Sequence, residues 1–239
     1  LFNPIILISY LLPFVSMITY IQFSMIICLI VSIILMYYFL RRRFDLKVSF
    51  VSTLLFLTSG CLIFHLHRHI MFVDYMPFLL MALIGVDKYF DKKKISLLVI
   101  SIFLMILTSY YFSVVGLVCI LLYGIFRYIE DKRNDKITVK DFFREGFKFI
   151  FIMLIPVLLS CFLLLPTAYS LLDGRTATNK SISLLGLFIP NFDISNTLYS
   201  SYSLGCSAIF IIALIYGVVT KKREVKVISI IFSILLVFP

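Results

Sequence analysis

Long apolar runs, separated by short clusters of lysine and arginine, constrain the fold of this chain more than any other feature. Of its 239 residues, 62% are hydrophobic and 14% are charged, whereas soluble domains are roughly 45–50% apolar and 25% charged. Every backbone polar group in lipid needs a partner within its own segment, so runs of this length form helices. The sequence therefore predicts an all-α, polytopic transmembrane helix bundle, with room for about seven or eight crossings.

The basic residues are concentrated in a few places. The formal net charge is +10, yet 19 of the 22 lysines and arginines fall in the stretches 41–47, 88–94, 127–148 and 221–226, between apolar runs. The positive-inside rule places such loops on the cytoplasmic side of the membrane. The charge therefore reports a multi-pass topology, and we expect no nucleic-acid partner. The three remaining basic residues, Arg68, Arg175 and Lys180, are then predicted at the outer face.

We expect a single transmembrane domain, and the order of the apolar and polar runs divides it into segments. Residues 1–22 are apolar and are either a span or a short half-buried helix at the outer surface; Pro13 interrupts the run and favours the surface helix. The start at Leu1 without a methionine, and an end within an apolar run, lead us to expect a fragment of a longer protein. The remaining segments are membrane helices over residues 23–166, an outer loop over 167–204 and truncated membrane helices over 205–239.

Two membrane hairpins are predicted in the middle of the chain. The first crosses outward over residues 51–64, turns at the histidine-rich stretch 65–69 and returns over residues 76–89. The second divides the apolar run 95–128 at Ser109, because one helix of about 50 Å would place its flanking basic clusters on opposite sides of a ~30 Å core.

A later crossing is predicted over residues 149–165, ending at Pro166. It leads from the basic stretch 127–148 to the predicted outer loop. The aromatic and charged residues just before it are typical of an interfacial helix, but we favour a simple lead-in to the span.

Ionisable residues gather at the tip of the first hairpin. His65, His67 and His69 are zinc-ligand types, and His65 and His69 share a helix face. A histidine pair without the glutamate of a metalloprotease is a weak pattern, so we favour a solvated tip and expect no metal. Asp74 is predicted at the mouth of a span, where an acid is costly unless it faces water or a partner. It is either functional or paired with Arg68 or a neighbouring histidine to close the hairpin.

Further candidates are expected at the outer face. Tyr110 and Tyr111 either satisfy a tight interfacial turn or line a cleft, stacking on a sugar or a lipid head group. Arg175 follows Gly174 close after a predicted span end. An arginine holds phosphate oxygens through two parallel bonds, which suits a lipid-linked phosphate, although a solvated loop arginine explains the same sequence.

Short motifs along nearly the whole chain carry a family resemblance. They are Ser59-Gly60 before the histidine-rich turn, Phe72 to Pro77, Ile84 to Asp87, Ser109 to Phe112, and Leu165-Pro166 through Arg175. With them the chain resembles the YfhO-type bacterial membrane proteins, which are placed among glycosyltransferases of the GT-C architecture. The resemblance implies a GT-C-like bundle with short paired helices and outer-face loops.

The resemblance also implies a function. Such enzymes move a sugar from a polyprenyl-phosphate-linked donor to a cell-envelope polymer, for example a teichoic acid, at the outer face, with no cofactor expected and membrane lipids around them. The family's main base is expected upstream of Leu1. Alternatives are a transporter or flippase for lipid-linked saccharides and a non-catalytic subunit of an envelope-assembly complex. The implied roles are a supporting catalytic carboxylate for Asp74, donor-phosphate binding for Arg175 and Arg68, and cleft positions for His65, His69, Tyr110 and Tyr111.

Overall fold

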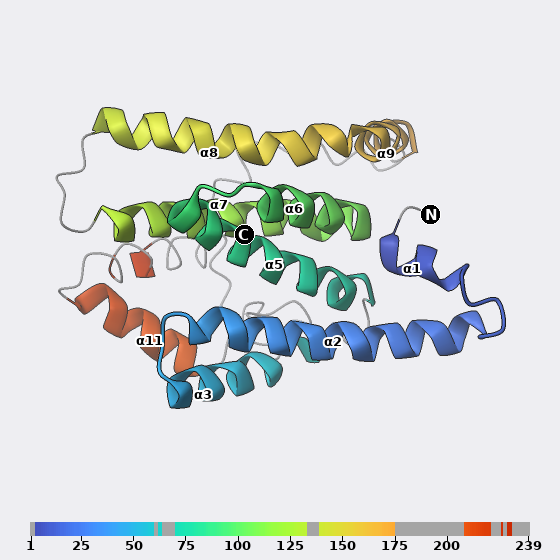
Figure 1. Cartoon of the computed structure of the whole chain (residues 1–239), viewed down its shortest axis with the longest axis horizontal. Helices are drawn as coiled ribbons and strands as arrows, with labels where there is room; N and C mark the ends of the chain where they lie inside the picture. Colours follow the sequence, from blue (N-terminus) through green and yellow to red (C-terminus); the bar gives the residue numbers. More distant parts are fainter. Residues whose placement is uncertain are drawn as a thin grey trace. The chain divides into compact units, whose positions relative to one another are not determined.

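A computed structural model describes residues 3–59, 62–63, 70–132, 139–174, 208–220, 226 and 229–230. Within these ranges the chain forms helices and no strand, which confirms the predicted all-α fold (Figure 1). The chain divides into two compact units, residues 1–58 with 62–169 and residues 59–61 with 170–239. Helix α11 (Ala208–Val219) belongs to the second unit.

Helix α5 (Ile70–Lys92) is the centre of the first unit. It packs against α2 (Met17–Arg41), α6 (Ser96–Thr108) and α7 (Tyr110–Asp131). At Gly85 a Cβ would lie 2.8 Å from the Cα of Leu98, so the close approach of α5 and α6 requires glycine there. This packing fixes the position of the acidic residues that α5 carries.

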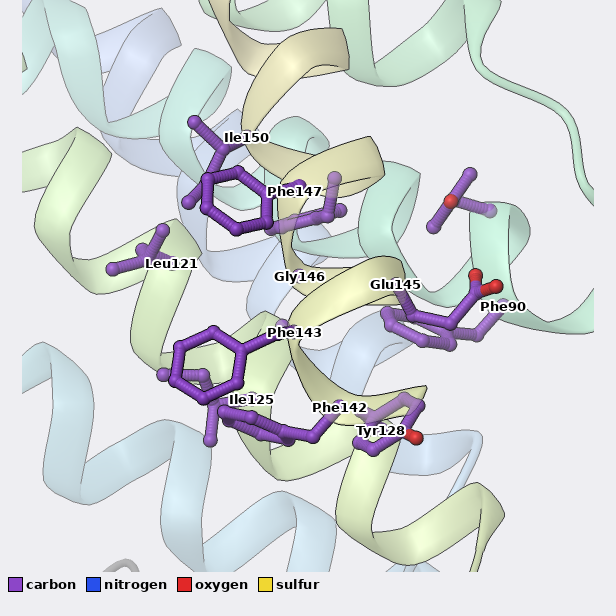
Figure 2. A pocket seen from close by; sticks show the side chains of 13 residues that line it. Phe90, Leu121, Ile125, Tyr128, Phe142, Phe143, Glu145, Gly146, Phe147 and Ile150 are labelled. Carbon is purple, nitrogen blue, oxygen red and sulfur yellow. The ribbon is translucent and has the colours of Figure 1, made fainter. Parts of the chain in front are cut away.

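Helix α8 (Val139–Leu159) lies against α6 and meets α7. The ring of Phe142 contacts that of Tyr128, with centroids 5.6 Å apart (Figure 2). Near the middle of α8, Phe149 contacts Tyr89 of α5 at 5.7 Å. Aromatic side chains therefore join α8 to α7 and to α5.

Two described helices, α2 and α7, are long and apolar enough to cross a membrane, with 25 and 22 residues. A third span results if α8 and α9 (Cys161–Gly174), bent by 72° at their junction, are counted as one. The apolar helices α3 (Leu46–Leu57) and α6 are shorter, with 12 and 13 residues, or roughly 18–20 Å against a ~30 Å core. The seven or eight crossings stay a prediction.

Two breaks in the helices fall where the sequence suggested them. Helix α1 (Pro4–Ser9) ends before Pro13, and α2 begins at Met17, where the Ser16 hydroxyl accepts a bond from the Thr19 amide at 3.3 Å. Helix α6 ends at Thr108 and α7 begins at Tyr110, because Ser109 between them has extended backbone angles. The long apolar run is therefore two helices.

The first predicted hairpin differs from the structure on its outward side. Helix α3 ends at Leu57, seven residues before the predicted end at Phe64, and it packs on α2. Its buried residues are small, Ser49 and Thr53, which allows a close approach to another helix. The Thr58 hydroxyl bonds back to the Leu54 carbonyl at 2.9 Å as the helix ends. The histidine-rich tip, residues 65–69, lies outside the described residues.

The predicted helix end at Pro166 is wrong. The break lies at Ser160, and Pro166 is inside α9. The carbonyl of Pro156 accepts from both the amide and the hydroxyl of Ser160, at 3.1 and 2.8 Å. A serine that bonds back in this way bends a helix, and Pro156 already removes one donor from the same turn. The predicted loop beyond residue 174 lies outside the described residues as far as residue 207.

Candidate functional site

Asp74 lies in the second turn of α5 and is buried, with 2% of its surface exposed. Of the two environments expected for an acid at the mouth of a span, water or a partner, the described residues surround Asp74 with protein. Its carboxyl lies next to the side chains of Cys28 on α2 and Asn3 at the start of α1. Within the described part of the chain, Asp74 Oδ1 has no hydrogen-bond partner, and neither has Asn3 Nδ2. A buried oxygen without a partner is costly, and such groups call for an explanation that includes function.

Aromatic rings connect the start of α5 to the start of α7. The ring of Phe112 lies 5.1 Å from that of Phe72 and 5.8 Å from that of Tyr75. Asp74 is therefore at the same end of this unit as Tyr110 and Tyr111, which are 41% and 71% exposed. The structure thus brings three of the predicted site residues to one end of the unit.

The other predicted site residues, His65, Arg68, His69 and Arg175, lie outside the described residues, so their roles stay predictions. In the part that the structure describes, no three histidine, cysteine, aspartate or glutamate side chains are placed to hold a metal ion. Asp74 is accordingly the described carboxylate on which a site can be built.

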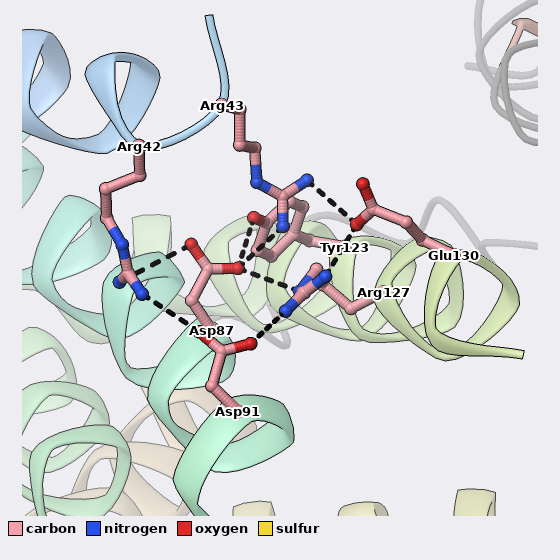
Figure 3. Close-up of polar contacts among 7 residues, drawn as sticks. All are labelled: Arg42, Arg43, Asp87, Asp91, Tyr123, Arg127 and Glu130. Carbon is pink, nitrogen blue, oxygen red and sulfur yellow. Dashed lines mark hydrogen bonds and ion pairs between the residues drawn. The ribbon is translucent and has the colours of Figure 1, made fainter.

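A cluster of ion pairs occupies the opposite end of α5 (Figure 3). Its centre is Asp87, which is 2% exposed. Asp87 Oδ1 accepts from Arg43 Nη2 at 2.8 Å and from the Tyr123 hydroxyl at 2.7 Å. Arg127 Nε lies 3.0 Å from the same oxygen. One carboxylate therefore joins the segment that follows α2 to α7.

Three further residues complete the ion cluster. Arg42 pairs with Asp91 at 2.9 Å, while Glu130 lies 2.6 Å from Arg127 and 3.3 Å from Arg43. Three arginines thus face three carboxylates, and the charges balance. Sequence reasoning used these arginines only as signals of orientation and missed the pairing. The signal was the helical spacing of the acids on α5, four positions apart.

The two buried acids lie far apart along one helix. Asp74 and Asp87 are separated by thirteen positions of α5, which corresponds to roughly 20 Å at 1.5 Å per residue. Asp87 Oδ2 also has no hydrogen bond among the described residues, although Arg42 lies 3.8 Å from it. The carboxylates of the ion cluster are balanced by arginines, which suits an anchor, whereas Asp74 has uncharged neighbours.

The sequence profile of a family described as bacterial membrane protein YfhO matches residues 1–238. The chain belongs to the YfhO family. The match covers both acids of α5, and it confirms the resemblance noted in the sequence. YfhO proteins are membrane proteins, in agreement with the apolar helices α2 and α7. No match to the chain was found among curated proteins or among solved structures.

Proposed function

We propose that this YfhO protein is a membrane glycosyltransferase that moves a sugar from a polyprenyl-phosphate-linked donor to a cell-envelope acceptor on the outer face. The observation that carries the proposal is the buried carboxyl of Asp74, with Oδ1 unpartnered among the described residues. The association of the YfhO family with glycosyltransferase-like function supports it.

The charge pattern supports chemistry at the outer face. Arg42 and Arg43 belong to the basic loops that the positive-inside rule assigns to the cytoplasm. They bind Asp87 and Asp91 at one end of α5. Asp74 then lies roughly 20 Å further toward the outer face, where lipid-linked sugars are used.

In the proposed reaction the acceptor hydroxyl attacks the anomeric carbon of the donor sugar with inversion. The bond between that carbon and the phosphate oxygen breaks, and the lipid phosphate leaves with the electron pair. A carboxylate takes the hydroxyl proton, and cations stabilise the leaving phosphate. Asp74 supports the base in this step, and Arg175 and Arg68 bind the phosphate. His65, His69, Tyr110 and Tyr111 line the cleft.

The test uses the full-length protein in proteoliposomes with a synthetic polyprenyl-phosphate donor that carries a labelled sugar. The proposal expects the label to appear on an added envelope polymer. Movement of intact labelled donor across the bilayer without transfer indicates a flippase instead. Neither transfer nor movement indicates a non-catalytic subunit.

A further inference from the structure

An apolar groove lies between α5, α7 and α8, beside the ends of these helices that carry most of the charges (Figure 2). Its volume is about 210 Å³. Phe143 and Phe147 of α8 line the groove and are 56% and 67% exposed. Phe90 of α5 and Leu121 and Ile125 of α7 also line it.

Three cations lie close to residues that line this groove. Lys93 Nζ lies 5.3 Å from the ring of Tyr89 and 5.6 Å from that of Phe90, and both rings line the groove. Lys148 Nζ lies 2.8 Å from Glu145, the one acid among the described lining residues. Arg144 also approaches Glu145, at 3.8 Å. The stretches 93–94 and 140–148 together hold five cations and two acids, so the chain beside the groove carries a net positive charge.

We propose that the groove binds one anionic phospholipid, with an acyl chain along its aromatic walls and the headgroup phosphate on Lys93 and Lys148. The first half of α8 mixes aromatic and charged residues, as helices at a membrane surface do. Basic pockets between membrane helices on the cytoplasmic side recognise anionic headgroups. This site lies at the end of the unit opposite Asp74 and is independent of sugar transfer.

Gly146 makes the groove testable, because it lines the groove and a Cβ there would meet no atom within 4 Å. A Cβ at this position therefore clashes with nothing in the described residues, and a bulky side chain that starts there is placed to obstruct the groove. Gly124 of α7 also lines the groove but cannot be used in this way, since a Cβ there would lie 2.5 Å from the ring of Phe149. A matched control is Val115→Phe, because Val115 is 67% exposed on α7 and is not part of the groove.

The experiment places the full-length protein in phosphatidylcholine nanodiscs that contain phosphatidylglycerol with a diazirine in one acyl chain. After irradiation, mass spectrometry locates the label, which we expect on the groove segments of α7 and α8. Gly146→Phe is expected to lower this label at least about fivefold, and Val115→Phe to leave it unchanged. If size exclusion shows that Gly146→Phe is poorly folded, Gly146→Leu replaces it as a smaller change. Gly146→Leu is also expected to lower the labelling.

The headgroup is tested with charge variants. The double variant Lys93→Gln/Lys148→Gln is expected to lower labelling by the phosphatidylglycerol probe at least about fivefold. A phosphatidylcholine probe with the same diazirine should label the groove weakly in every variant. The control Arg41→Gln/Lys47→Gln removes two exposed cations of the same unit that do not line the groove, and it should keep wild-type labelling.

Three outcomes would overturn the proposal. They are undiminished groove labelling in Gly146→Phe and Gly146→Leu, equal labelling of the wild-type groove by the two phospholipids, and preferential labelling by a polyprenyl-phosphate probe. The second would show ordinary boundary lipid, and the third would show that the groove holds the carrier of the sugar.

Discussion

Asp74 and Asp87 are both 2% exposed on helix α5, but within the described part of the chain only Asp87 has arginine partners. Arg43 and Arg127 fix Asp87 from two directions, whereas the neighbours of Asp74 are the uncharged side chains of Asn3 and Cys28. Two acids on one helix thus have different environments. Changes at Asp87 should affect stability, and changes at Asp74 should affect activity.

Asp87→Asn keeps the size of the side chain but removes the charge that balances Arg43 and Arg127. Removing one partner of a buried ion pair leaves the other uncompensated, and we expect a loss of about 3 kcal/mol in the free energy of unfolding. Thermal unfolding in detergent measures it. The control is Asp141→Asn, because Asp141 is 50% exposed where it pairs with Arg144, and a surface pair contributes about 0–1 kcal/mol. Equal midpoints for the two variants would show that the ion cluster does not anchor the helices.

Arg43→Lys tests the geometry of the ion cluster. Arg43 bonds Asp87 and Glu130 at once, and its guanidinium lies 5.3 Å from the ring centre of Tyr123. Lysine keeps the charge, but it lacks the several N–H donors and the planar surface of a guanidinium, so we expect about 1–2 kcal/mol of destabilisation. Arg41→Lys is the matched control, since Arg41 bonds only the exposed Phe44 carbonyl among the contacts described. If the two variants unfold at the same temperature, the guanidinium geometry of Arg43 contributes nothing to stability.

The sequence located the features that depend on local pattern. Pro13 and Ser109 interrupt apolar runs, and helices break near both. The predicted helix end at Pro166 was wrong, because the break depends on the hydrogen bonds of Ser160. The burial of Asp74 was also not predictable, since the side chains beside it come from residues 46 and 71 positions earlier in the chain.

The pairing in the ion cluster required the packing as well. Asp87 meets Arg43 across 44 positions and Tyr123 across 36. Counting charges assigned the arginines to loops on the cytoplasmic side of the membrane, but it carries no information on which acid each arginine contacts. Only the packing of α5 against α2 and α7 brings them together.

Membrane orientation is tested by single cysteines in a cysteine-free background. Tyr111→Cys lies at the Asp74 end of the unit, and Lys94→Cys lies at the exposed basic end. The positive-inside rule expects an impermeant thiol reagent on intact cells to modify the Tyr111 site, and the Lys94 site only after permeabilisation. The reverse pattern would place Asp74 toward the cytoplasm and would remove the outer-face chemistry.

Arg175, which lies outside the described residues, is predicted to bind the donor phosphate. Arg175→Lys keeps the charge but loses the two parallel bonds, so the donor KM should rise several-fold, and Arg175→Ala should raise it further. Lys180→Ala, in the same predicted loop, is the control and should leave KM unchanged. A wild-type donor KM in Arg175→Ala at normal protein levels would show a solvated arginine.

The most direct test compares sugar transfer by wild type and Asp74→Asn in proteoliposomes with the labelled polyprenyl-phosphate donor. Asparagine has nearly the same shape but no charge, so we expect transfer to fall at least about tenfold, on the order of 1.4 kcal/mol. Protein level and thermal midpoint should stay unchanged, and Asp141→Asn should transfer at the wild-type rate. Full transfer by Asp74→Asn would contradict a role for this carboxylate in the reaction.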